Sequence, residues 1–218
     1  MQERWHGAAS MLARLGPPHL AAALGVLVLY VVQAEVRFGN LARGSKPGAA
    51  DRGSTWAIST AIVVPVAGLV LATKSAMFPA SRWLAYFGPS SPAAMPGMPA
   101  LGWLGVAVGA LGLPLRLWAV LTLRERYTRT LFVHENHAIE RSGPYRFVRH
   151  PGYLGSLLTM NGIALATGNA AVLVASLVVT FAAYAHRIRV EDAMLVAAFG
   201  DAYDEYRREV RGLIPFLW

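Results

Sequence analysis

The chain has 218 residues, of which 55% are hydrophobic and only 15% are charged. Soluble domains carry about a quarter charged residues, so this composition excludes an ordinary soluble enzyme and predicts one integral membrane domain. The net charge of +8 lies beside apolar runs, which is typical of cytoplasmic loops facing anionic lipid, and we expect no nucleic-acid partner. The absence of cysteine excludes thiolate nucleophiles and Cys-ligated zinc.

Apolar runs predict five membrane-spanning helices, because a spanning helix needs about 20 mostly apolar residues. The predicted spans cover residues 17–36, 55–73, 101–123, 153–166 and 170–186. Pro65 is expected to kink the second span without ending it. The last two spans share the uncharged run 151–185, which is longer than one span and shorter than two. We therefore predict a short helical hairpin that turns at residues 167–169.

The basic residues are distributed unevenly among the connecting segments. They gather in segments 37–54 and 124–150 and in the tail after residue 186, whereas the loop 74–100 contains only Lys74 and Arg82. The excess of Lys and Arg on one side predicts an N-terminus outside and a C-terminus and active site in the cytoplasm. We expect the inner membrane of a bacterium.

The tail is expected to form one amphipathic helix. Residues 186–211 repeat apolar side chains at helical spacing, and Gly212 and Pro215 are typical of a helix end. We expect this helix to leave the fifth span and fold back over the cytoplasmic face. The chain is thus predicted to be an all-α integral membrane protein. Its parts are residues 1–123, with three spans, and residues 124–218, with the hairpin, the tail helix and the site.

Two further patterns are interpreted as structural or as chance. The glycine-rich run in the third span is not interpreted as a phosphate-binding loop, because no predicted strand comes before it. Its glycines fall on one helical face, as close packing of membrane helices requires. These glycines are Gly102, Gly105, Gly109 and Gly112. The sequence His-Glu-Asn-His at residues 134–137 lacks the HExxH spacing and a third ligand, so we expect no metal site.

Two polar motifs beside apolar runs are the candidate functional sites, since ionisable groups are costly there. Pro151 fixes the backbone after His150 and can begin a helix, which would make His150 part of a rigid polar ledge at the membrane interface. Arg187 and Glu191 are four residues apart and share one helical face. They could hold the two ends of a zwitterionic ligand or could form an ordinary exposed ion pair.

These motifs resemble the isoprenylcysteine carboxyl methyltransferase and phospholipid methyltransferase superfamily. The resemblance covers residues 115–215, with a first motif over residues 143–155 and a second over residues 187–206. Relatives commonly have a second Glu where this chain has Asp192, and often a Gly-containing turn where it has residues 124–126. The roles of these two departures are left open.

The resemblance implies S-adenosylmethionine as cofactor and methyl donor. By motif position, Arg187 and Glu191 are the implied catalytic residues, with Arg187 facing the methyl acceptor and Glu191 binding the cofactor as well. The implied cofactor-binding residues are His137, Ala138, Ile139, Glu140, Tyr145, His150, Pro151, Gly152, Tyr153 and Glu191.

The implied function is methyl transfer to a carboxylate, or another nucleophile, of a lipid-like substrate, including an isoprenylated one. A carboxylate needs no general base, whereas the amine of a phospholipid would need deprotonation by Glu191 or His150. A sterol-reductase-like enzyme using NADPH is a further alternative, although its relatives usually have Asn and Asp where this chain has Pro151 and Ser156. A non-catalytic membrane scaffold or transporter is the alternative from another class. The sequence leaves the acceptor and the oligomeric state open.

Overall fold

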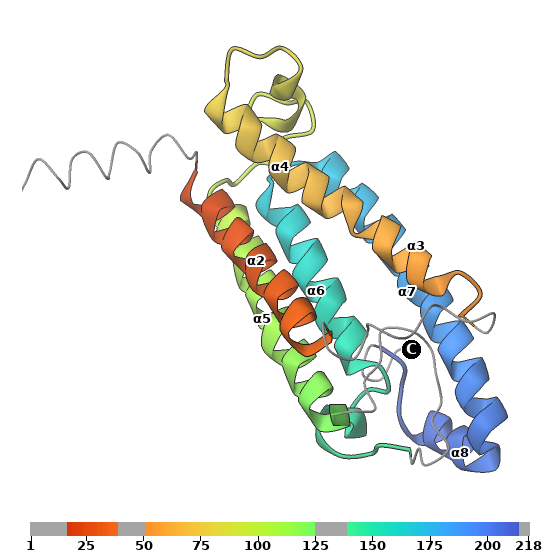
Figure 1. Ribbon diagram of the computed structural model, residues 1–218. Coiled ribbons are helices and arrows are strands. Elements are labelled where there is room, and N and C mark those ends of the chain that lie inside the picture. Colours follow the sequence, from red (N-terminus) through yellow and green to blue (C-terminus); the bar gives the residue numbers. More distant parts are fainter. Residues whose placement is uncertain (1–16, 39–50, 125–138, 214–218) are drawn as a thin grey trace, which may run out of the picture.

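The computed structural model describes residues 17–38, 51–124 and 139–213, and this part of the chain folds as a bundle of long helices (Figure 1). No strand occurs among the described residues, which agrees with the predicted all-α class. The α-helices are α2 (Pro18–Phe38), α3 (Ser54–Ala61), α4 (Val63–Met77), α5 (Ala100–Leu123), α6 (Pro151–Ala166), α7 (Ala170–Phe199) and α8 (Asp201–Glu209). Two short 3-10 helices are η2 (Leu84–Phe87) and η4 (Gly143–Arg146).

Three helical segments of the described chain are long and apolar enough to cross a membrane. They are Ser54–Met77, Ala100–Leu123 and Ala170–Phe199. The apolar part of α2 and the 16-residue α6 are shorter. The chain is therefore a multi-pass membrane protein, while the predicted total of five crossings stays a prediction.

The second predicted span consists of α3 and α4, which meet at Ile62. Pro65 lies one turn beyond this junction and has no N–H to donate to the carbonyl of Ala61. The helical direction nevertheless continues, because the Val66 N–H donates to the Ile62 carbonyl at 3.4 Å. The expected interruption without termination is confirmed.

Helices α5 and α6 pack closely through small residues. The four glycines that the sequence places on one face of α5 are all buried. A Cβ atom added at Gly105 would lie only 2.5 Å from the backbone nitrogen of Ala166, so the two backbones approach too closely for any side chain. The hydroxyl of Thr159 donates across the interface to the Gly109 carbonyl at 3.2 Å. The interpretation of the glycines as a packing face is confirmed.

The hairpin of α6 and α7 turns at residues 167–169 as predicted, but its second helix is longer than expected. Asn169 caps α7 by accepting hydrogen bonds from the N–H groups of Ala171 and Val172. The helix then continues through the charged residues to Phe199 instead of ending at residue 186. The break comes at Gly200, which has a φ of +55°, and α8 starts immediately after it.

The tail also differs from the predicted single helix over residues 186–211. Helix α8 ends at Glu209, and the chain then runs alongside the segment before α6. The Arg149 N–H donates to the Arg211 carbonyl at 2.8 Å, and the His150 N–H donates to the Gly212 carbonyl at 3.0 Å. These backbone bonds end the helix early and hold the tail beside the His-Pro turn.

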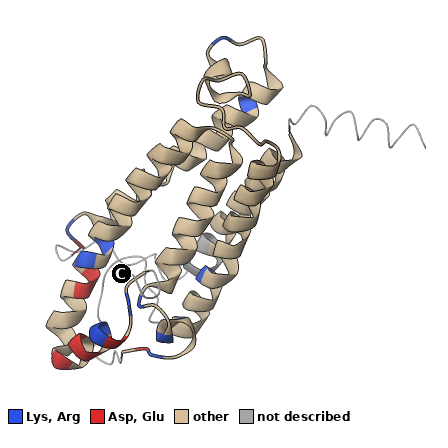
Figure 2. Ribbon diagram, turned by 180° about the vertical axis from the view of Figure 1, so that it is seen from behind, with Lys and Arg blue, Asp and Glu red and all other residues tan. Residues whose placement is uncertain are grey.

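Charged residues gather at one end of the bundle (Figure 2). We call this the charged end; it contains α8, the last turns of α7 and the turn at residues 143–150. The opposite end, called the loop end, contains residues 78–99 and the α6–α7 turn, and Figure 2 shows few charges there. This separation follows the charge asymmetry of the sequence, and the predicted orientation in the membrane remains a prediction.

Candidate functional site

The His-Pro turn forms a rigid ledge at the charged end. His150 has non-helical backbone angles (φ −122°, ψ 58°) and directly precedes α6, whose first residue is Pro151. The buried imidazole of His150 stacks on the ring of Tyr153, with the ring centroids 5.4 Å apart and the planes 6° apart. Pro151 and Gly152, the first two residues of α6, are buried.

Asp192 joins the ledge to α7 and α8. Its carboxylate accepts a hydrogen bond from Nη2 of Arg149 at 3.0 Å and another from the hydroxyl of Tyr203 at 2.6 Å. Nε2 of His150 lies 3.1 Å from Oδ1 of Asp192, and this hydrogen bond requires a proton on Nε2. Burial raises the pKa of Tyr203, and the neighbouring Asp192 carboxylate raises it further. Asp192, whose role the sequence left open, therefore connects helix α7 to helix α8 and to the segment before α6.

Glu191 lies beside the same imidazole, and one of its two carboxylate oxygens lacks a hydrogen-bond donor among the described residues. Its Oε2 atom is 3.5 Å from Nδ1 of His150. That oxygen is buried and accepts no hydrogen bond within the described part of the chain. A buried carboxylate oxygen without a donor is costly, by at least ~1–3 kcal/mol, so it marks a place for a donor from a ligand.

Arg187 is buried in a polar network with the first turn of α3 and the residue Asp51 before it. Its Nη1 atom donates to Asp51 at 2.7 Å and also to the hydroxyls of Ser54 and Thr55. Its Nε atom donates to the hydroxyl of Tyr153 at 3.0 Å. The exposed fractions are 3% for Arg187 and 1% for Asp51, so this is a buried ion pair.

Asp51 is the residue that sequence reasoning missed. Its carboxylate also accepts hydrogen bonds from the Ser54 hydroxyl and from the N–H and hydroxyl of Thr55. Burial opposes ionisation, but these hydrogen bonds, together with the charge of Arg187, hold the pKa of Asp51 below its usual value. The only local pattern that could have drawn attention to Asp51 is its place three and four residues before Ser54 and Thr55 at the start of an apolar run, which is typical of a helix start.

Three of the remaining predicted residues, Ile139, Glu140 and Tyr145, are among the described residues. The backbone carbonyl of the buried Tyr145 accepts a hydrogen bond from Tyr206 at 2.6 Å. Ile139 and Glu140 are half-buried, and the Glu140 carboxylate accepts from the Ser142 N–H at 3.0 Å. His137 and Ala138, together with His134 and most of the 124–126 departure, lie outside the described residues. No metal-binding cluster occurs within the described ranges.

The structure therefore brings the two sequence motifs into contact. His150 touches the acidic pair at residues 191 and 192, and Tyr153 touches Arg187. A flat aromatic surface, a carboxylate oxygen without a donor and a fixed guanidinium meet at one end of the bundle. Such a set can hold a small cationic or zwitterionic molecule next to an anionic group.

Comparisons with known proteins point to membrane methyltransferases. The sequence profile of the phospholipid methyltransferase family matches residues 101–202. A probable protein-S-isoprenylcysteine O-methyltransferase of Oryza sativa subsp. indica is 30% identical over 119 residues, covering 54% of this chain and 62% of that protein. The protein-S-isoprenylcysteine O-methyltransferase of Schizosaccharomyces pombe is 32% identical over 120 residues, covering 54% of this chain and 49% of that protein.

The chain is also similar to a metal-resistance protein and to a solved structure. The cobalt-zinc-cadmium resistance protein CzcN of Cupriavidus metallidurans is 36% identical over 118 residues, covering 54% of this chain and 49% of that protein. The solved structure of a eukaryotic intramembrane Ras methyltransferase, isoprenylcysteine carboxyl methyltransferase, matches with a TM-score of 0.63. At 20% identity, over 92% of this chain and 68% of the other, that match establishes a shared fold. The matched regions span about half to two thirds of these curated relatives.

Proposed function

We propose that this chain, which belongs to the superfamily of isoprenylcysteine carboxyl methyltransferases and phospholipid methyltransferases, is a membrane methyltransferase that uses S-adenosylmethionine. Its proposed acceptor is the carboxylate of a lipid-like, isoprenylated substrate, in keeping with the printed names of its relatives. The observation that carries the proposal is the buried Oε2 of Glu191, which accepts no hydrogen bond from the residues that the structure describes and lies 3.5 Å from Nδ1 of His150 on the ledge.

The residues of the ledge fit this cofactor. The Glu191 carboxylate would accept hydrogen bonds from the ammonium group or the ribose hydroxyls, which supply the missing donor. The stacked rings of His150 and Tyr153 offer a flat surface, and the Gly152 backbone has no side chain to keep a ligand away. Ile139, Glu140 and Tyr145, together with His137, Ala138 and Pro151, complete the proposed pocket. S-adenosylmethionine, when bound, supplies an electrophilic methyl group on its sulfonium.

The chain's own contribution to the reaction would be positioning. A carboxylate acceptor is already anionic, so no proton has to be removed, and alignment of the two reacting groups supplies much of the rate. Arg187 would face this carboxylate, with its guanidinium held by Asp51 on one side and by Tyr153 on the other. Since Asp51 already neutralises part of its charge, Arg187 would orient the acceptor without binding it too tightly.

The position of the site suits an amphiphilic acceptor. The polar residues lie at the charged end, which we propose to be cytoplasmic, and the cofactor would reach them from water. The apolar part of the acceptor would stay among the membrane helices and enter sideways. The N-terminus would then lie outside.

The test is transfer of labelled methyl groups from S-adenosylmethionine by the full chain in detergent. The acceptors are an isoprenylated cysteine and a membrane lipid extract, and the products are identified by mass analysis. We expect a base-labile methyl ester, lost in Glu191→Gln and kept in the exposed control Asp201→Asn. In parallel, S-adenosylmethionine should raise the thermal midpoint of unfolding, whereas NADPH should not. A midpoint raised by NADPH alone, or no labelled product, would contradict the proposal.

The second candidate is N-methylation of a phospholipid amine. The match to the phospholipid methyltransferase profile favours it, and the unsatisfied Oε2 of Glu191 could take the proton that an amine must lose. The same assay separates the two functions, because methyl groups on nitrogen survive base treatment that cleaves esters.

A further inference from the structure

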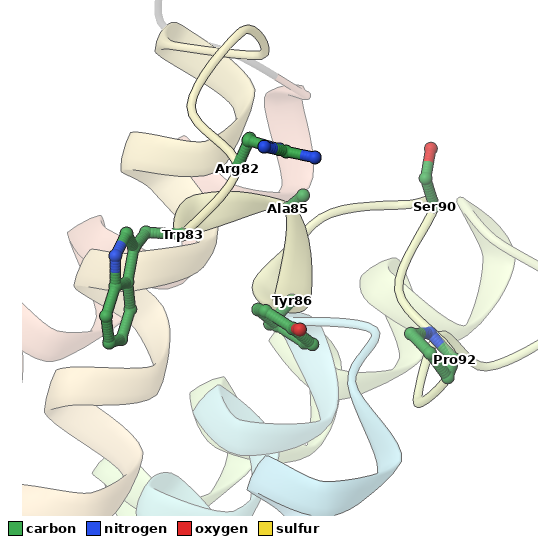
Figure 3. A pocket seen from close by; sticks show the side chains of 6 residues that line it. All are labelled: Arg82, Trp83, Ala85, Tyr86, Ser90 and Pro92. Atoms are coloured by element: carbon green, nitrogen blue, oxygen red, sulfur yellow. The ribbon is translucent and has the colours of Figure 1, made fainter.

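Two pockets adjoin at the loop end, far from the ledge. A polar pocket is lined by Arg82, Trp83, Ala85, Tyr86, Ser90 and Pro92 (Figure 3). An apolar pocket of about 570 Å³ lies between α4 and α7, with Ala67, Leu71, Val172 and Ala175 among its lining residues. Tyr86 and Pro92 line both pockets, so the two are adjacent. The apolar volume lies within the range of ~300–1,000 Å³ that is usual for ligand pockets.

The wall that the two pockets share is fixed by hydrogen bonds. Nδ2 of Asn169 donates to the Tyr86 carbonyl at 2.9 Å. The Ala170 N–H donates to the Ala93 carbonyl at 2.7 Å, and the Met95 N–H donates to the Gly168 carbonyl at 2.8 Å. The loop over residues 84–95 is thereby tied to the α6–α7 turn. The pockets are part of the folded chain and do not depend on a ligand to form.

The polar pocket has a cation without an internal counter-charge. Arg82 is exposed and forms no ion pair within the described part of the chain. Residues 53–124 contain no Asp or Glu, and Lys74 adds a second positive charge at the same end. Figure 3 shows the guanidinium of Arg82 extending above Ala85 toward the side on which Ser90 and Pro92 lie, while Trp83 points the other way. The pocket therefore favours an anion from outside this segment.

We propose that the two pockets together bind one anionic glycerophospholipid of the surrounding membrane. Its phosphate contacts Arg82 and the hydroxyl of Ser90, and one acyl chain lies in the apolar pocket between α4 and α7. Trp83, which is 84% exposed, sits at the membrane interface beside the headgroup, as aromatic residues commonly do. A pocket that contains a cation, next to an apolar pocket beside the apolar helices α4 and α7, matches the two chemically distinct parts of a phospholipid. The lipid would hold the loop end of α4 against α7.

The test measures lipid retained by the full chain in a neutral detergent, using native mass spectrometry. The probes are dioleoyl phosphatidylglycerol, dioleoyl phosphatidylcholine and inorganic phosphate. We expect one phosphatidylglycerol to be retained in preference to phosphatidylcholine. Arg82→Gln should reduce that preference about fivefold, the ratio that corresponds to ~1 kcal/mol per basic residue near anionic lipid. Arg208→Gln, an exposed arginine on α8 at the charged end, is the matched control and should change nothing.

A second pair of variants tests the apolar pocket. Ala175→Phe places a ring in the pocket and should lower retention of phosphatidylglycerol, whereas Val178→Phe, at an exposed position outside the pocket lining, should not. Inorganic phosphate should not displace the lipid. Equal retention of both lipids, an unchanged preference in Arg82→Gln, unchanged retention in Ala175→Phe or displacement by inorganic phosphate would each overturn the proposal.

Discussion

Replacing Asp51 by alanine should destabilise the protein more than any single change at an exposed ion pair. In the native chain the Asp51 carboxylate is 2.7 Å from Nη1 of Arg187, and both side chains are nearly inaccessible to water. Asp51→Ala leaves the buried guanidinium with its hydroxyl partners but removes the carboxylate in direct contact with it, so that Glu191 is the nearby anion that remains. Breaking a buried ion pair from one side typically costs ~3–5 kcal/mol.

The double variant Asp51→Ala/Arg187→Met separates loss of the charge pair from loss of packing. Removing both charges abolishes the cost of an unpaired cation, so the double variant should be more stable than Asp51→Ala alone. Its stability should approach that of the native chain. Methionine is chosen because its flexible apolar side chain fills much of the space that the arginine stem leaves.

The measurement is reversible unfolding in mixed detergent, with each variant compared at equal protein and detergent concentrations. The matched control is Glu209→Ala, which removes the partner of Arg141 from an ion pair whose side chains are 43% and 53% exposed. Exposed pairs contribute less than ~1 kcal/mol, so this control should change the unfolding free energy little. Equal effects of Asp51→Ala and Glu209→Ala, or a double variant less stable than both single variants, would refute the reasoning.

Three further predictions concern the packing of α5 against α6, the hydrogen bond between Tyr203 and Asp192, and the loss of stability at low pH. Gly105→Ala should lower stability by ~1–3 kcal/mol because its Cβ would collide with the Ala166 backbone, whereas Gly25→Ala, which meets no atom within 4 Å, should not. Tyr203→Phe should cost ~1.5–3 kcal/mol in the same unfolding assay by removing the 2.6 Å bond to Asp192; no change would show that this bond contributes nothing. The lowered pKa of Asp51 contributes stability that is complete above its unfolded value of about 4 and is lost as the pH falls through the folded value. Stability of Asp51→Asn should therefore vary less between pH 5 and pH 2; an identical acid profile would exclude this role.

Local sequence patterns were sufficient to predict the helices and their packing faces. Uninterrupted apolar runs locate α2, α4, α5 and the hairpin, because each run has to be buried or to face lipid. The spacing of the α5 glycines also predicts the side that meets α6. The predicted boundary at residue 186, between the fifth span and a tail helix over residues 186–211, was wrong, because one helix continues to Phe199 and the break comes at Gly200. Polar residues continue a helix readily when partners satisfy them, and Asp192 and Arg187 both have such partners.

The contacts that assemble the candidate site could be predicted only in part. The family motifs identify His150 and Glu191, and the structure places their side chains together. Asp51 is separated from Arg187 by 136 residues, and a local capping pattern says nothing about a distant partner. The backbone pairing of residues 148–150 with residues 210–212 has the same origin, since no periodic pattern specifies it.

The most direct test of the account is calorimetric titration of S-adenosylmethionine into the full chain in detergent. The native chain should bind one molecule, and Glu191→Gln should bind about 10–100-fold more weakly, as expected for loss of a charge-assisted hydrogen bond worth ~1.5–3 kcal/mol. Asp201→Asn should bind like the native chain. Undiminished affinity in Glu191→Gln, or no binding by the native chain, would contradict the claim that the His150 ledge and Glu191 enclose this cofactor.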